Sequence, residues 1–171
     1  AFETATNLNT VATARRGASG WHLEVEGRQA HSSGVFGAAG YGAIYEAARI
    51  VNSFRETLSK EQYLTFNPGL FMGGSELNYQ ETVQSGTVSG KTNIISPKTV
   101  VIGDLRFISE TQKEAARNTM RQIVSQSLPG TKASIRFSDG IPAMSPTEGN
   151  AKISVQLSAV SEAMGLGKVN P

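Results

Sequence analysis

The sequence predicts an α+β domain of the ferredoxin-like type, with element order βαββαβ and a four-stranded antiparallel sheet carrying two helices on one face. Apolar residues alternate at strand spacing in 21–25 and 133–137, and they recur at helical spacing in 43–58 and 116–128. Four half-buried strands and two helices with one apolar stripe each are buried most economically when both helices cover the same sheet face. The other sheet face is expected to stay half-exposed, and a C-terminal tail helix is added to this unit.

Composition excludes several classes of function. The chain has 171 residues, of which 39% are hydrophobic and 18% charged, as is typical of a globular protein. It has no cysteine, which excludes disulfides and thiolate metal ligands. The net charge is +2, and no basic run exceeds Arg15–Arg16. No apolar run approaches the ~20 residues of a membrane span. We therefore expect neither nucleic acid nor a membrane as a partner, and the compartment stays open between cytoplasm and periplasm.

The first strand is indicated by Trp21, Leu23 and Val25, which alternate with polar residues until Gly27. A loop at 28–34 follows. A helix is then predicted from Val35 to Leu58, with glycines in its first turns that allow another backbone to approach closely. Its apolar stripe consists of Ala43, Ala47, Ile50, Phe54 and Leu58, widened by Ile44 and Val51.

The second strand is predicted at 63–72 and is interrupted by Asn67–Pro68–Gly69. Because proline cannot donate a hydrogen bond to a neighbouring strand, this segment is expected to be an edge strand with a bulge or bend. Residues 75–90 are polar and punctuated by glycine, which indicates a loop or a protruding hairpin.

The second half of the domain begins with a β-branched strand at 98–108. Ser109 and Gln112 predict a capping box at the start of the second helix, which Leu128–Pro129–Gly130 ends. The last strand carries Ala133, Ile135 and Phe137 on one face. A connector at 140–149 leads to the tail helix, which Asn150 is expected to cap.

The residues that could carry chemistry are few. Only His22 and His31 are available as imidazoles, and no motif for a complete metal site or a nucleophile elbow is present. His22 is out of phase with the apolar residues of its strand, so it is expected on the exposed sheet face. His31 lies in a loop before Ser32–Ser33, where an ordinary surface histidine is the plain alternative to a functional one. For Asn93 and Arg106 the plain alternatives are a turn residue and an arginine that pairs across the sheet.

Four short motifs, which follow one another along the chain, together resemble the pattern of a known protein family. They are G-x-x-A-H-S at 27–32 before an alanine-rich helix, N-x-G with a following G-G at 67–74, N-I-I at 93–95, and D-x-R at 104–106. Together they resemble the lid domain of the di-zinc peptidases and deacylases that include glutamate carboxypeptidase, aminoacylase and succinyl-diaminopimelate desuccinylase. The resemblance covers about residues 15–140.

The resemblance implies a domain organisation and partners. Residues 1–16 would be a linker from a catalytic domain that this chain lacks, 17–140 the lid and dimerisation domain, and 141–171 the return into the catalytic domain. The chain begins with Ala1 and not methionine, which is consistent with a piece of a longer protein. The domain would form a homodimer through the helix at 35–58 and the neighbouring edge strand at 63–72. Two zinc ions are expected in the catalytic domain and no cofactor in this chain, which alone would be inactive.

The resemblance also implies residue roles. His31 would reach the partner subunit's active site and hold the substrate carbonyl oxygen, where charge grows in the transition state. Asn93 would add a hydrogen bond to the substrate, and Arg106 would bind a substrate carboxylate through two parallel hydrogen bonds. The substrate would be a small peptide or an N-acyl amino acid.

Two departures from the family pattern bear on the substrate. Ser96 stands where the family has a proline, and segment 75–90 is longer than expected. A free-standing ferredoxin-like module that binds a ligand or a protein is the rival hypothesis. An RNA-recognition module is a weaker one, because the aromatic residues mostly alternate into the core.

Overall fold

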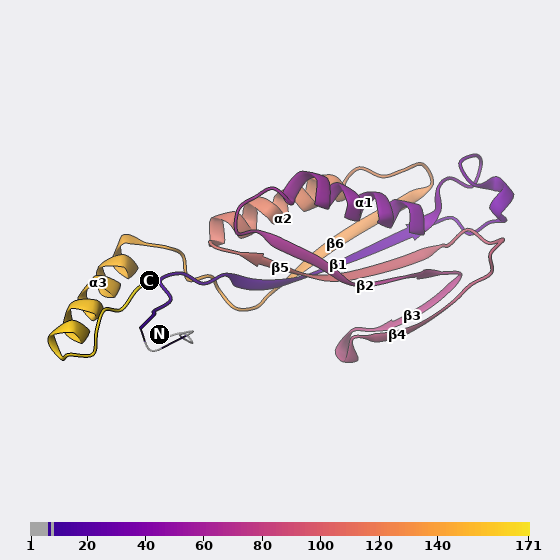
Figure 1. Cartoon of the computed structure of the whole chain (residues 1–171). Coiled ribbons are helices and arrows are strands. Elements are labelled where there is room, and N and C mark those ends of the chain that lie inside the picture. The colour runs from indigo at the N-terminus through magenta and orange to yellow at the C-terminus, as the bar shows by residue number, and fades with distance from the viewer. Residues whose placement is uncertain (1–6, 8) are drawn as a thin grey trace.

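The computed structural model describes residue 7 and residues 9–171 of the chain. Its main sheet has the strand order β2-β5-β1-β6, with every neighbouring pair antiparallel. Helices α1 and α2 lie together on one face of this sheet (Figure 1). The elements run in the order β1 Gly17–Gly27, α1 Gly42–Leu58, β2 Thr65–Gly74, β3 Glu76–Gln80, β4 Ser85–Ser89, β5 Lys98–Phe107, α2 Glu110–Val124, β6 Thr131–Asp139 and α3 Glu148–Ala163. The predicted fold class is confirmed.

The core lies between the sheet and the two helices. Trp21, Leu23 and Val25 of β1 point into it, as their alternation predicts, and pack with Phe54 of α1 and Met120 of α2. The Trp21 and Phe54 rings meet edge to face at 5.9 Å between centroids. The stripe of α1 inferred from spacing is therefore its buried face, except that Ile44 is exposed and Val51 only partly buried.

Strand β2 is one edge of the sheet, as its proline predicts. Its register against β5 shifts between Pro68 and Leu70, at the expected bulge. The strand begins at Thr65 and not at the predicted residue 63, because Tyr63 has a φ of 65° and belongs to the preceding turn. It continues to Gly74, two residues beyond the predicted end.

The predicted start of the first helix at Val35 is wrong, because α1 begins at Gly42. Phe36 and Gly40 have φ values of 68° and 75°, so the backbone of the predicted first turns is left-handed there and not helical. A short 3₁₀ turn at Ser32–Gly34 and a loop occupy the space before α1. The glycines thus shape a loop and do not form the first helical turns.

Residues 75–90 form a two-stranded hairpin, β3–β4, which lies on the sheet face away from the helices (Figure 1). The prediction that His22 is exposed on this face is wrong, because the residue is only 7% exposed. Arg136 and Glu24 contact its ring, and Tyr79 of the hairpin packs edge-on against it. This face is therefore partly covered by the hairpin.

The caps of the later helices differ in detail from the predictions. Ser109 accepts a hydrogen bond from the Gln112 backbone N–H at 3.1 Å, but the Gln112 side chain accepts one from Ile108 and not from Ser109. Thr147, and not Asn150, caps α3, and its hydroxyl accepts from the Asn150 N–H. The strand predicted at 98–108 ends at Phe107.

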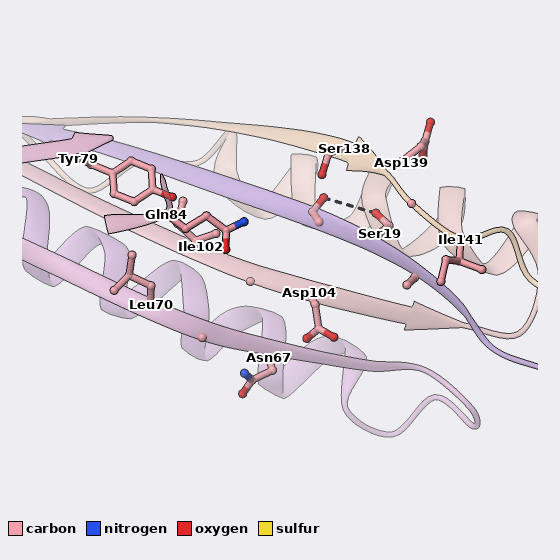
Figure 2. Close-up of a pocket in the computed structure, with 15 residues that line it drawn as sticks. Ser19, Asn67, Leu70, Tyr79, Gln84, Ile102, Asp104, Ser138, Asp139 and Ile141 are labelled. Carbon is pink, nitrogen blue, oxygen red and sulfur yellow. Dashed lines mark hydrogen bonds between the residues drawn. The ribbon is translucent and has the colours of Figure 1, made fainter. Parts of the chain in front are cut away.

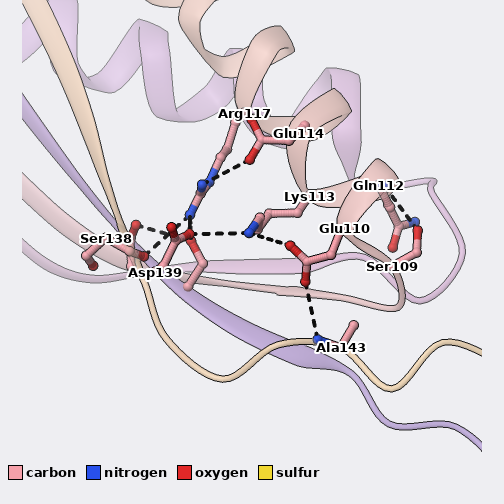
Figure 3. Close-up of polar contacts among 11 residues, drawn as sticks. Ser109, Glu110, Gln112, Lys113, Glu114, Arg117, Ser138, Asp139 and Ala143 are labelled. Carbon is pink, nitrogen blue, oxygen red and sulfur yellow. Dashed lines mark hydrogen bonds and ion pairs between the residues drawn. The ribbon is translucent and has the colours of Figure 1, made fainter.

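The connector after β6 is tied to α2 by a cluster of charged side chains (Figure 3). Asp139 accepts hydrogen bonds from Arg117 at 2.7 Å and from Lys113 at 3.3 Å. Glu110 pairs with Lys113 and accepts from the backbone N–H of Ala143. These contacts fix the direction in which the chain leaves the sheet toward α3.

Helix α3, residues 9–16 and the C-terminal residues lie beyond the end of the sheet at which β5 finishes (Figure 1). The described part of the predicted linker at 1–16 pairs with the returning chain, since the Arg15 and Met144 backbones exchange two hydrogen bonds. Residues 1–6 and 8 of that linker lie outside the described residues. Among the described helices, none is both long and apolar enough to span a membrane.

Candidate functional site

His31 and Asn93, which are far apart in sequence, come together at one end of the sheet. The Ser32 N–H donates to the Asn93 carbonyl at 2.9 Å, and the Ile95 N–H donates to the Ala30 carbonyl at 2.9 Å. His31 and Ile94 form an isolated antiparallel bridge. The loop after β1 and the turn before β5 therefore form one backbone unit, on which His31 and Asn93 are both exposed.

The contacts of the His31 ring determine which of its nitrogens carries the proton. The backbone N–H of Ser33 donates to Nδ1 at 3.2 Å, and the Ser33 hydroxyl lies 2.8 Å from the same nitrogen. Because Nδ1 accepts a hydrogen bond, the proton of the neutral ring resides on Nε2. His31 thus presents a hydrogen-bond donor from an exposed loop.

Arg106 lies at the opposite end of the sheet from His31. It pairs with Ala18 near the start of β1, whereas Lys98, at the other end of β5, pairs with Glu26 just before the His31 loop. The eight steps from Lys98 to Arg106, at about 3.3 Å each, span about 26 Å. One small substrate therefore cannot touch His31 and Arg106 of the same subunit.

Within the described part of the chain, the side chain of Arg106 makes no hydrogen bond or ion pair with a neighbouring strand, although such a pair was its plain alternative. Its Nε donates to Asp104 Oδ2 at 2.8 Å, and both residues are on β5. The side chain is 48% exposed. Among the described residues, none accepts a hydrogen bond from its two terminal nitrogens, so they can bind an anion in parallel.

An open-face cleft of about 660 Å³ lies on the sheet face away from the helices (Figure 2). Asp104, which binds Arg106, is part of its wall. All four strands of the sheet and the hairpin contribute to the cleft, with Asn67 and Leu70 from β2, Ile102 from β5, Tyr79 and Gln84 from the hairpin, and Ile141 from the connector among its lining residues. Sequence reasoning missed this cleft because it depends on the docking of the hairpin.

His22 belongs to a polar cluster beneath the hairpin. Arg136 of β6 contacts its Nδ1 and also pairs with Glu81 at the tip of the hairpin. The pKa of His22 lies below its ordinary value, first because burial disfavours the charged ring and second because Arg136 is close. The hydrogen bond from Arg136 lowers the pKa of Glu81. This cluster fastens the hairpin to the sheet.

The described residues do not make a metal site of their own. They contain no group of three or more His, Cys, Asp or Glu side chains that could hold a metal ion. A zinc centre, which usually takes three or four such ligands, does not fit the side chains of the described part of this chain.

The outer edge of β2 and the neighbouring side of α1 carry exposed apolar side chains. Tyr45 is 54% exposed, Ile44 43% and Phe71 44%. Phe36 stacks edge-on with Tyr41 and Tyr45, beside a groove of about 360 Å³. The backbone groups on the outer side of β2 have no strand partner in the described sheet. An unpaired edge next to exposed apolar residues is suited to pairing with another chain.

Comparison with protein families gives a match over most of the chain. The peptidase dimerisation domain of M20 peptidases matches residues 13–132. No curated protein matches the chain in sequence.

Solved structures resemble the chain in fold. Aminopeptidase PepT from Bacillus cereus has a TM-score of 0.69 at 17% identity, with 98% of this chain and 41% of that chain covered. A tripeptidase from Staphylococcus aureus has a TM-score of 0.69 at 16% identity, with 98% and 40% covered. An amidase of the hydantoinase/carbamoylase family from Burkholderia phymatum has a TM-score of 0.62 at 13% identity, with 94% and 37% covered. The chain thus spans about two fifths of the length of these proteins.

Proposed function

We propose that this chain, which belongs to the family of peptidase dimerisation domains, serves as the lid and dimerisation domain of a zinc-dependent amide hydrolase. The parent enzyme would cleave small peptides or N-acyl amino acids. Its two zinc ions would be bound by a catalytic domain outside this chain, where they would polarise the scissile amide. The isolated chain would bind no zinc and catalyse nothing.

The observation that carries this proposal is the presentation of His31. The Ser33 N–H holds Nδ1 as an acceptor, which leaves the Nε2 proton for donation at an exposed loop. A donor fixed in this way can stabilise the negative charge that develops on a substrate carbonyl oxygen. Asn93, held against the same loop, would add a second hydrogen bond to the substrate.

The position of Arg106 supports a division of roles between subunits. Arg106 pairs with Ala18, whose N–H donates to the carbonyl of Ile141 in the connector to α3. The chain enters β1 and leaves toward α3 at this end of the sheet (Figure 1). A catalytic domain joined there would lie near Arg106, which pairs with the start of β1. We assign Arg106 to the site of its own subunit, as a carboxylate clamp, and His31 to the partner's site.

Dimerisation through α1 and β2 would bring these parts together. Two copies of β2 that pair along their free edges would form one continuous sheet, with α1 of each subunit beside the other. Tyr45 and Phe71 would be buried in this isologous contact.

Subunit complementation in the parent enzyme tests the arrangement. His31→Ala and Arg106→Ala homodimers should both be nearly inactive, with kcat of the first lowered on the order of a hundredfold. A heterodimer of the two variants should contain one intact site and therefore recover about half of the wild-type activity. A heterodimer as inactive as its parents would contradict action of His31 in the partner's site.

Metal analysis of the same variants separates catalysis from zinc binding. His31→Ala should retain the zinc content of the wild-type enzyme, because His31 is assigned to the substrate oxygen and not to the metal. A loss of zinc in proportion to the loss of turnover would refute this assignment.

A further inference from the structure

We propose that the β3–β4 hairpin is a specificity element, whose tip closes one end of the open-face cleft and selects substrates with a medium-sized or large neutral side chain. This inference rests on the proposed function and extends it, because it names the substrate class and the residue that selects it. Tyr79 is the selecting residue, and Gln84 would bind the peptide group that all substrates share.

The hairpin reaches the cleft from the far end of the sheet. Its base, where Glu76 pairs with Ser89, follows β2 at the end near the His31 loop. Its strands then run beneath the sheet toward the other end (Figure 1). Tyr79 and Gln84, on either side of the turn at Glu81–Val83, thereby meet the strands beside Asp104.

The hairpin tip is fixed to the sheet before any ligand binds. Glu81 pairs with Arg136 through both of its oxygens. The Tyr79 ring packs edge-on against the buried His22 ring, at 5.7 Å between centroids. These contacts preorganise the wall, so substrate binding does not have to order it.

The side chains that the cleft offers to a ligand are uncharged. Leu70, Ile102 and Ile141 give apolar surface, with Tyr79 at the same end of the cleft as Ile102 (Figure 2). Asn67 and Gln84 also line the cleft, and their amides can hydrogen-bond to a peptide group.

The acidic residues of the cleft are already neutralised by partners. Asp104 is paired with Arg106, and Asp139 with Arg117 and Lys113. Among the described residues that line the cleft, none is Lys, Arg or His. The cleft therefore favours neither a cationic nor an anionic side chain, whereas the substrate carboxylate is bound by Arg106 outside it.

The size of the cleft agrees with a substantial side chain. Its volume of about 660 Å³ lies within the ~300–1,000 Å³ of typical small-molecule sites. Glycine substrates would leave much of the apolar surface in contact with water, so leucine and phenylalanine substrates should bind better.

The test compares side-chain selectivity in the parent enzyme. kcat/KM is measured for N-acetyl amino acids and for tripeptides, each series carrying glycine, alanine, leucine, phenylalanine, glutamate or lysine next to the scissile amide. Tyr79→Ala should lower the preference for leucine and phenylalanine over glycine by about tenfold. Gln84→Gly, which keeps the left-handed backbone at φ 48°, should lower kcat/KM for all members about equally. Val83→Ala is the matched control, because Val83 is 63% exposed at the same tip and does not line the cleft.

The outcomes separate this inference from the proposed function. Unchanged selectivity in Tyr79→Ala, or an equal change in Val83→Ala, would overturn the role of the hairpin and leave the proposed function standing. A preference of the wild-type enzyme for charged side chains would overturn the assigned substrate class. A parent that cleaves neither series would overturn the proposed function and this inference together.

Discussion

Replacement of Gly103 by alanine should destabilise the domain, because this position in β5 has no room for a methyl group. A Cβ added there would lie well inside 3.0 Å of two ring carbons of Trp21 and of the Asn67 carbonyl oxygen. The Asn67 oxygen is backbone of the adjoining edge strand, so it cannot move away by a side-chain rotation. Strand β2 would have to separate from β5, which would displace the edge that we assign to the dimer.

The magnitude follows from two opposing contributions. Alanine is normally favoured over glycine in a strand by about 0.5–1 kcal/mol. Overpacking of a well-filled core costs about 1–3 kcal/mol, and the upper part of that range applies because the new methyl group is blocked on two sides. The net loss should be about 2 kcal/mol, which corresponds to a urea midpoint lowered by about 1 M.

Trp21 itself reports on this unfolding transition. It is the only tryptophan of the chain, it is 2% exposed, and its Nε1 donates to the Asp104 carbonyl at 2.9 Å. Urea unfolding followed by its fluorescence measures wild type, Gly103→Ala and the control Gly69→Ala. At Gly69 the nearest atom to an added Cβ is 3.7 Å away, so the control should be neutral or slightly stabilised. Equal midpoints for wild type and Gly103→Ala would refute the packing argument.

Three further predictions use other contacts of the structure. Arg49→Ala should lower the free energy of unfolding by about 3 kcal/mol, because Glu46 is fully buried and, among the described residues, would keep only the Leu128 N–H as partner. In urea unfolding, the double variant Arg49→Met with Glu46→Gln should recover much of this loss. Because the pKa of His22 is lowered in the folded protein, the unfolded chain binds a proton more readily, so the free energy of unfolding should be highest above pH 6.5 and fall as the pH drops below it. His22→Gln should flatten this part of the profile of unfolding free energy against pH. An unchanged profile would contradict the assignment of this pH dependence to His22. Tyr45→Glu should shift the parent dimer toward monomers in sedimentation experiments, whereas Ala115→Glu on the exposed side of α2 should not, and equal association of both variants would place the interface elsewhere.

The features that sequence predicted well are those set by local patterns. The alternation of Trp21, Leu23 and Val25 identified the buried side of β1, and Pro68 identified β2 as an edge strand with a bulge. The predicted start of α1 failed because Val35 and Phe36 extend the apolar pattern, although the backbone there turns through left-handed conformations. Periodicity records which residues are apolar and not the φ angles of the glycines between them.

The features that sequence missed depend on long-range contacts. His22 is buried because Arg136, Glu81 and Tyr79 converge on it from segments more than 50 residues away. A polar residue out of phase in a strand gives no sign that a hairpin will cover it. In the same way, the nearness of His31 and Asn93 follows from backbone pairing between two loops. The roles of His31 and Arg106 stay predictions that complementation can test, and the role of Asn93 stays a prediction.

The distance between the two ends of the sheet has a consequence for regulation under the proposed function. If each active site needs Arg106 from one subunit and His31 from the other, the monomer is inactive and activity depends on dimer formation. Specific activity would then fall on dilution below the dissociation constant of the pair, and the amount of protein synthesised would itself switch the enzyme on. Strand β5, which is paired from Lys98 to Phe107, separates His31 from Arg106 within one subunit. Because of this separation, a single subunit could not assemble a complete site.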